Sequence, residues 1–336
     1  MGRHGVSLLS RRFRRLRGEH ILCSARRRPA RPQAGEVRPQ IGSSQFRRGE
    51  MADRLSEVLE SDDVEQLATD FVFTEGPLWH PEGYWLFVDI RRSLIFRIAP
   101  GGEPKVERDN SGGSNGLTFD LQGRLIMCEG DNRRLTRRED NGSISVFVDQ
   151  WEGKKLNRPN DLVGRSDGTV YFTNPNGRIA PEDREIDFAG VHAVRPDGSQ
   201  FVAIRDFEYP NGLVFSPDES VLYVANTRES KHIEAFDVAV DGTVSNGRVW
   251  ADMSSDEPDG VPDGMKVDVE GRVYCTGPGG CWVFDSDGSN MGIIRLPEIP
   301  ANVAWGGPDH RTMLFTARTS IYTMRMTTEG IHIPTS

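Results

Sequence analysis

Short apolar runs separated by polar turns fill the chain from about residue 62 onward. Within the runs apolar and polar residues alternate, and Asp-Gly or Pro-Asp pairs stand between them, which is typical of antiparallel β-hairpins. One turn-and-strand pattern recurs six times, and its first copy is residues 76–83. The strands predicted directly after the six copies span residues 85–89, 124–128, 170–173, 221–225, 272–275 and 313–316.

The spacing of these copies predicts the fold. They begin between roughly 39 and 52 residues apart, a period typical of propeller blades. Further strands are predicted between the copies, at residues 94–98, 143–148, 190–194, 232–238 and 282–284. About four strands per period predict an all-β fold, a six-bladed β-propeller, in which the strands close into a ring. A β-sandwich would explain the strands but not their repetition.

One position of the repeat carries candidate chemistry. In a propeller the innermost strand of each blade lines the central tunnel, so equivalent positions converge although they are far apart in sequence. The residue just before the repeated Gly or Asp is Glu75, Asn115, Asn160, Asn211, Asp263 and Ala301, or Asn302 if the last copy begins one residue later. Such a ring of carboxylate and amide oxygens, without thiol or imidazole, predicts a site for one divalent cation. We expect Ca²⁺, with Mg²⁺, Mn²⁺ and Zn²⁺ as alternatives. Any single Asn-Gly pair could instead be an ordinary turn.

Charge is distributed unevenly along the chain. Residues 1–50 hold 13 Arg, no Lys and 3 acidic residues, which leaves 28 basic and 47 acidic residues for the remainder. An acidic body repels nucleic acid and anionic membrane and favours cations in a central tunnel. No apolar run approaches the roughly 18–20 residues of a membrane span. We therefore expect a monomer or small homo-oligomer that acts on a small molecule, with no nucleic-acid or membrane partner.

The chain divides into three parts. Residues 1–50 form an Arg-rich extension, residues 51–61 a lead-in segment with a short helix, and residues 62–336 the propeller. The extension has three interpretations: sequence upstream of a start at Met51, a mitochondrial transit peptide, or a basic RNA-binding arm. The first implies a cytoplasmic protein and the second a mitochondrial one. The four cysteines have no CxxC spacing and are expected to be reduced, although Cys275 and Cys281 could face each other across a hairpin.

Several stretches also resemble a known family. They are residues 73–79, Arg158-Pro159-Asn160-Asp161, residues 209–213, Pro262-Asp263-Gly264-Met265 and residues 302–309. In this order they resemble the family of regucalcin (senescence marker protein), gluconolactonases and luciferin-regenerating enzyme. The resemblance covers about residues 62–330, and residues 122–137 are most similar to the bacterial gluconolactonase branch.

The resemblance implies a propeller with one divalent metal in its tunnel and lactone hydrolysis as its activity. Matched by motif, the metal ligands are Glu75, Asn160, Asn211 and Asp263. Asp263 is also the expected catalytic residue, as general base for the attacking water or, less favoured, as nucleophile. The expected substrate-binding residues are Arg158, Asn160 and Asn115, although Arg158 could also be a surface arginine beside a turn.

Two departures from the family pattern leave the substrate open. Glu129-Gly130 stands where gluconolactonase-like members often have a Glu-His pair, and the segment after Asn174-Pro175 is short and charged. A second class of function is a calcium-binding or protein-interaction propeller without turnover, because a fold alone does not decide function. The same site could also hydrolyse a different ring or ester, such as an organophosphate or a cyclic ketone.

Overall fold

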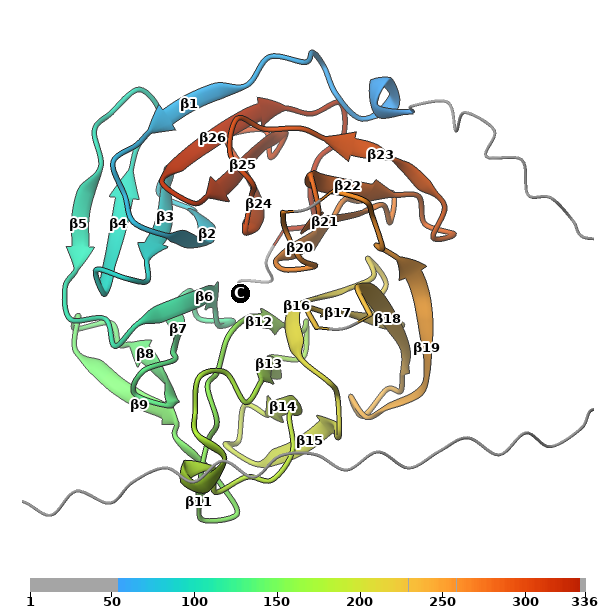
Figure 1. Ribbon diagram of the computed structural model, residues 1–336. Coiled ribbons are helices and arrows are strands. Elements are labelled where there is room, and N and C mark those ends of the chain that lie inside the picture. Colours follow the sequence, from blue (N-terminus) through green and yellow to red (C-terminus); the bar gives the residue numbers. More distant parts are fainter. Residues whose placement is uncertain (1–53, 229, 258, 333–336) are drawn as a thin grey trace, which may run out of the picture. The chain divides into compact units, whose positions relative to one another are not determined.

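Six four-stranded antiparallel sheets surround a central tunnel (Figure 1). The structure, a computed structural model, describes residues 54–332 apart from 229 and 258. The predicted Arg-rich extension therefore lies outside the described residues. The prediction of an all-β, six-bladed propeller is confirmed, and the inner strands β2, β6, β12, β16, β20 and β24 face the tunnel.

Blades one to five are each formed by four consecutive strands. Blade one contains β2 (Thr74–His80), β3 (Tyr84–Asp89), β4 (Leu94–Ile98) and β5 (Lys105–Arg108); blade two contains β6 (Ser114–Phe119), β7 (Leu125–Glu129), β8 (Arg134–Arg138) and β9 (Ile144–Val148); blade three contains β12 (Leu162–Gly164), β13 (Val170–Asn174), β14 (Gly190–Val194) and β15 (Gln200–Ile204). Blade four contains β16 (Pro210–Phe215), β17 (Val221–Asn226), β18 (His232–Val238) and β19 (Val244–Asp252); blade five contains β20 (Met265–Val267), β21 (Val273–Gly277), β22 (Gly280–Phe284) and β23 (Asn290–Ile294). A small hairpin, β10 (Gln150–Trp151) with β11 (Lys154–Lys155), and a 3-10 turn, η2 (Pro181–Asp183), lie outside the blades.

Blade six closes the ring with strands from both ends of the described chain. From the tunnel outward it contains β24 (Asn302–Gly306), β25 (Thr312–Ala317) and β26 (Ser320–Arg325), and its outer strand is β1 (Glu65–Ala68). β1 pairs with β26 through Glu65 opposite Thr323, and Figure 1 shows these two strands side by side. This pairing removes two free sheet edges and ties the first strand to the last.

The lead-in segment contains less helix than expected. Its only described helical element is a single 3-10 turn, η1 (Leu55–Glu57). The next two residues, Val58 and Leu59, are buried in the apolar cluster between blades five and six. Burial of this pair, rather than helix formation, attaches the segment to the propeller.

The apolar core lies between neighbouring blades. Leu86 and Val88 of β3 pack against Leu117 of β6 and Met127 of β7, and similar clusters fill the other blade interfaces. Each blade is covered on both faces, which is why middle strands such as β3 are buried at almost every position. No described helix is long and apolar enough to cross a membrane.

The described cysteines are buried and unpaired. Cys128, Cys275 and Cys281 are free thiols, while Cys23 lies outside the described residues. Cys275 pairs in register with Trp282, and Cys281 with Thr276. The two cysteines are thus one register position apart and point to opposite faces of blade five, so they do not face each other across the hairpin.

Candidate active site

The predicted site residues lie where the inner strands begin. In three blades a β-bulge interrupts the inner strand at this point, between Glu75 and Leu78, between Ser114 and Leu117, and between Pro210 and Leu213. Bulges often re-aim side chains beside active sites. The Asn-Gly pairs at 115–116 and 211–212 therefore belong to bulged strands, and the ordinary-turn interpretation is wrong for both.

In four blades the glycine that follows the predicted residue allows neighbouring inner strands to approach closely. A methyl group at this position would lie 2.0 Å from the Asn115 carbonyl oxygen at Gly76, 2.6 Å from Asp161 Oδ1 at Gly116, 2.2 Å from the Asp263 carbonyl oxygen at Gly212, and 1.9 Å from Asn302 Cγ at Gly264. Backbone hydrogen bonds cross between the blades at the same level, including Gly116 N–H to Asn160 O at 2.8 Å. Glycine is required here because the next blade occupies the space of a side chain.

Blades three and six have a polar residue in place of this glycine. The hydrogen bond from Gly264 N–H to Ala301 O matches the one from Gly116 N–H to Asn160 O, so Asn302 is the equivalent of Asp161. Asn302 Nδ2 donates to Glu75 Oε2 at 2.9 Å and to Asp161 Oδ2 at 3.4 Å. Both Asp161 and Asn302 are buried.

Sequence reasoning missed Asp161 as a site residue and left Asn302 as an alternative phase of the last repeat. A signal was present, because these are the copies in which a side chain with an oxygen replaces the repeated glycine. The structure brings both residues together with Glu75 at the centre of the ring.

Asp263 and Asn211 meet between blades four and five. The Asn211 side chain lies beside the Asp263 carboxylate and favours its charged form. Asn211 Nδ2 also donates to Thr227 Oγ1 at 2.9 Å, and Thr227 Oγ1 donates to Pro262 O at 2.7 Å. These two bonds connect Asn211 to the backbone of Pro262, directly before the predicted catalytic residue Asp263.

The electrostatics favour a cation in the ring. Burial, followed by the negative charge of Asp161, raises the pKa of Glu75 to about 7. Burial, followed by the charges of Glu75 and Asp161, raises the pKa of Asp263. Three carboxylates thus share a desolvated space in which their mutual repulsion is weakly screened. A divalent cation would neutralise this charge, and the all-oxygen donors are of the type that hard cations prefer.

These donors are not a cluster of acids alone. Among the described residues, no group of three or more His, Cys, Asp or Glu side chains is arranged to hold a metal ion. The predicted ligand set combines the Glu75 and Asp263 carboxylates with the Asn160 and Asn211 amides. The residues present fit a divalent cation through this mixed set.

The predicted substrate-binding residues line a small pocket of about 40 Å³ at the mouth of the same end. Asn115 Nδ2 donates to Asn160 Oδ1 at 2.5 Å, and Arg158 Nη1 pairs with Asp131 Oδ1 at 2.6 Å. The Arg158 side chain passes beside Gly130, where a methyl group would lie 3.3 Å from Arg158 Cγ. The Glu-Gly departure from the family pattern thus makes room for this arginine.

Glu129, the other half of that pair, has a structural role. Its carboxylate is fully buried and accepts hydrogen bonds from Asn132 Nδ2 at 2.7 Å and Thr136 Oγ1 at 2.8 Å. It also forms ion pairs with Arg108 at 2.5 Å and Arg134 at 2.7 Å. Burial opposes its ionisation, but these bonds outweigh it and lower the pKa of Glu129.

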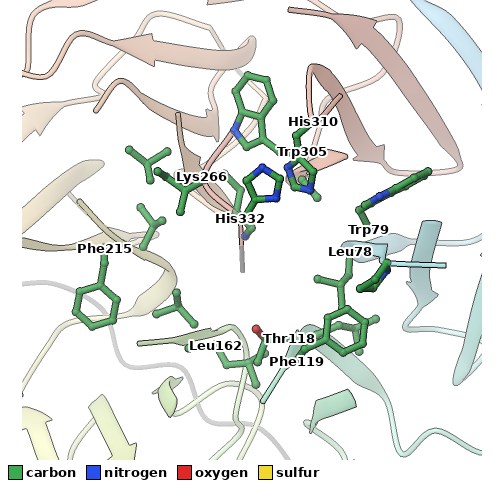
Figure 2. Close-up of a pocket in the computed structure, with 18 of the residues that line it drawn as sticks. Leu78, Trp79, Thr118, Phe119, Leu162, Phe215, Lys266, Trp305, His310 and His332 are labelled. Atoms are coloured by element: carbon green, nitrogen blue, oxygen red, sulfur yellow. The ribbon is translucent and has the colours of Figure 1, made fainter. Parts of the chain in front are cut away.

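A larger cavity, of about 580 Å³, lies at the opposite ends of the inner strands (Figure 2). Leu78, Phe119, Phe215 and Trp305 line it, and none of the predicted site residues does. This apolar cavity and the predicted site residues are therefore at opposite ends of the tunnel. The carboxylates and amides of the candidate site converge at the polar end.

Two lactonases from other organisms are similar to this chain over most of its length. A gluconolactonase of Zymomonas mobilis is 29% identical over 303 residues, covering 82% of this chain and 85% of that protein. A pentonolactonase of Haloferax volcanii is 28% identical over 244 residues, covering 70% of this chain and 78% of that protein.

The solved structures and the family match agree with these relatives. A gluconolactonase of Xanthomonas campestris has a TM-score of 0.74 at 32% identity, covering 81% of this chain and 92% of that chain. The family described as SMP-30/Gluconolactonase/LRE-like region matches residues 73–319, which confirms the resemblance noted in the sequence. Because this match covers well over half of the 336 residues, the chain belongs to the SMP-30/gluconolactonase/LRE-like family.

Proposed function

We propose that the protein is a metal-dependent lactonase that opens a sugar lactone to the corresponding hydroxy acid. The observation that carries the proposal is the buried ring of three carboxylates and several amides at the polar end of the tunnel. The names of two relatives, a gluconolactonase and a pentonolactonase, support sugar lactones as the substrate class.

In this proposal Glu75, Asn160, Asn211 and Asp263 hold one divalent cation, with Ca²⁺ expected and Mg²⁺, Mn²⁺ or Zn²⁺ as alternatives. When bound, such a cation supplies Lewis-acid polarisation of the lactone carbonyl. Asp161 and Asn302 position these residues from the centre of the ring, because the Asn302 amide donates to both Glu75 and Asp161 and keeps their carboxylates in place.

Asp263 is proposed as the general base. The neighbouring Asn211 side chain favours the charged carboxylate, and burial, the larger effect, raises its pKa, which makes it a stronger proton acceptor. It takes a proton from a water molecule whose oxygen bonds to the carbonyl carbon. The bond from that carbon to the ring oxygen then breaks, and the ring oxygen takes up a proton to become the hydroxyl of the product.

Substrate recognition is assigned to the mouth of the tunnel. Arg158 has five N–H donors, and its ion pair with Asp131 leaves several of them for hydroxyl oxygens of the substrate. Asn115 and Asn160 line the same small pocket and offer amide groups. This set of polar groups fits a polyhydroxylated ring better than an apolar ester.

A pH-indicator assay tests the proposal with a panel of aldonolactones in the presence of Ca²⁺, Mg²⁺, Mn²⁺ or Zn²⁺. We expect acid release that a chelator abolishes and added metal restores. Asp263→Asn should lower kcat by at least about a hundredfold, the usual contribution of a general base. The variant should still fold and unfold cooperatively on heating. Asp256→Asn, which removes an exposed carboxylate nearby in the sequence, is the matched control and should retain activity.

Three outcomes would contradict the proposal in whole or in part. Full activity of Asp263→Asn would exclude the assigned base. Stoichiometric metal binding without acid release from any lactone would favour the calcium-binding propeller instead. Release from an organophosphate or a cyclic ketone alone would keep the site but replace the substrate class.

A further inference from the structure

The cavity of about 580 Å³ at the far end of the tunnel has no role in the proposed hydrolysis. Its volume lies within the roughly 300–1,000 Å³ typical of small-molecule sites. Glu75 and Leu78 lie three residues apart on β2, so the cavity wall begins about 10 Å along the strand from the acidic ring. Pro81, Pro217 and Pro308 at its edge are exposed, which places its opening on the face opposite the active site.

The wall of this cavity is largely apolar and aromatic. Inner strands of all six blades contribute to it, and Figure 2 shows Leu78, Trp79, Phe119, Leu162, Phe215 and Trp305 around the space. A sugar lactone would have to bury its hydroxyl groups against these side chains without partners, at a cost of about 1–3 kcal/mol for each group. The ligand that fits this wall has an apolar body.

The C-terminal segment completes the wall. Ile331 N–H donates to Val267 O at 3.3 Å, and Gly330 N–H donates to His310 O at 3.1 Å. These bonds hold Ile331 and His332 beside the cavity, where the His332 ring contacts the His310 ring in a tilted arrangement with centroids 3.8 Å apart. This part of the wall is thus held in place by backbone hydrogen bonds.

One cation faces this apolar space. Lys266 on β20 lines the cavity, and its Nζ donates to the Met265 carbonyl oxygen at 3.0 Å. Within the described part of the chain, no carboxylate lies within ion-pair distance of Lys266. The Lys266 charge does reach Glu75 of the acidic ring, where it lowers the pKa of that carboxyl. Of the acids on the wall, Glu82 is exposed and Glu219 is engaged by Ser166, whose backbone N–H donates at 2.7 Å.

We propose that this cavity binds an amphipathic monocarboxylic acid, with its apolar body against the aromatic wall and its carboxylate at Lys266. The apolar body contributes affinity through its burial against the aromatic side chains, and the Lys266 ammonium supplies a charged contact for the carboxylate. None of the residues assigned to the lactonase site lines this cavity, so the proposal does not depend on that function, although the Lys266 charge also acts on Glu75.

Isothermal titration calorimetry of the full chain with decanoate, naphthoate and the uncharged decanol tests the proposal. We expect one decanoate or naphthoate per chain and tighter binding of decanoate than of decanol. Lys266→Met should weaken decanoate binding by about ten- to a hundredfold, the usual value of a hydrogen bond to a charged group, and leave decanol binding unchanged. Lys266→Arg should retain binding, as should Lys154→Met, which removes an exposed lysine of β11.

A filling variant locates the ligand. Thr118→Phe places a ring where the Thr118 side chain faces the cavity in Figure 2, and it should abolish binding of both decanoate and decanol. If this variant does not fold, quenching of tryptophan fluorescence by bound naphthoate, reduced in Trp79→Phe, gives the same information. The proposal is overturned if neither acid binds saturably, if decanol binds as tightly as decanoate, or if Lys266→Met leaves decanoate binding unchanged.

Discussion

Gly264→Ala is the sharpest test of how the blades meet around the acidic ring. Gly264 lies directly before β20, and a methyl group there would lie 1.9 Å from Asn302 Cγ and 2.0 Å from Asn302 Oδ1. The Asn302 side chain is buried and hydrogen-bonded to Glu75. The Asn302 side chain can make room for the methyl group only by losing its hydrogen bond to Glu75 or by shifting together with blade six.

Either route has a similar cost. Overpacking an interior by one methyl group costs about 1–3 kcal/mol. Turning the Asn302 amide away leaves the buried Glu75 carboxylate without its 2.9 Å donor, which also costs about 1–3 kcal/mol. A loss of this size in a chain of this length lowers the midpoint of thermal unfolding by about 2–5 °C.

The measurement is thermal unfolding followed by circular dichroism, together with lactone turnover at a temperature where the variant is folded. Gly164→Ala is the matched control, because Gly164 also lies on an inner strand and a methyl group there would meet only Phe119 O at 3.6 Å. We expect the control to change stability by less than about 1 kcal/mol. In Gly264→Ala we expect turnover to fall as well, because Asn302 no longer holds Glu75.

Equal unfolding midpoints for the two alanine variants would refute this reasoning. Such a result would mean that blades five and six are not in close contact at Gly264. A stability loss without any change in turnover would show instead that the Asn302 amide is not needed to position Glu75.

Three further predictions concern stability. His192 is buried, and burial, followed by the charge of Arg205, lowers its pKa from 6.5 to about 4. As the pH falls, the unfolded chain therefore takes up a proton on this histidine before the folded chain does, and the free energy of unfolding should fall by up to about 3 kcal/mol between pH 6.5 and 4. His192→Phe should reduce this pH dependence in urea unfolding. Glu129→Gln leaves Arg108 and Arg134 facing an uncharged group and should lower the free energy of unfolding by about 2–3 kcal/mol. The loss is limited because both arginine side chains remain partly exposed to solvent. Deletion of residues 54–68 removes the outer strand of blade six and should abolish cooperative unfolding.

Each has its contrary result. An unchanged pH slope in His192→Phe would place the acid sensitivity elsewhere. Glu129→Gln with native stability would show that the two arginines are satisfied by water. A deletion variant that unfolds cooperatively near the native midpoint would show that blade six closes without β1.

The blades could be predicted from sequence because their signals are local. β4, β14 and β18 begin and end at the predicted residues, since alternating apolar residues and Asp-Gly turns act within a few positions along the chain. The length of the lead-in helix was overestimated, because the burial of Val58 and Leu59 depends on the distant surface that they cover.

The candidate site was only partly predictable. The repeat phase placed Glu75, Asn115, Asn160, Asn211 and Asp263 at one end of the tunnel, where the structure has them. It did not identify Asp161, whose carboxylate reaches the centre because the strand of blade two carries a glycine, Gly116, opposite it.

By itself the sequence determined the number of blades, their order and the oxygen-rich end of the tunnel, because each repeat carries its own strands, turns and polar residue. The tertiary structure alone decided which strand closes the ring, which residues meet across it and what lies at its other end. β1 joins blade six because Glu65 pairs with Thr323, a contact that no local pattern encodes. The apolar cavity around Lys266 exists for the same reason, since its wall is assembled from single side chains of all six blades.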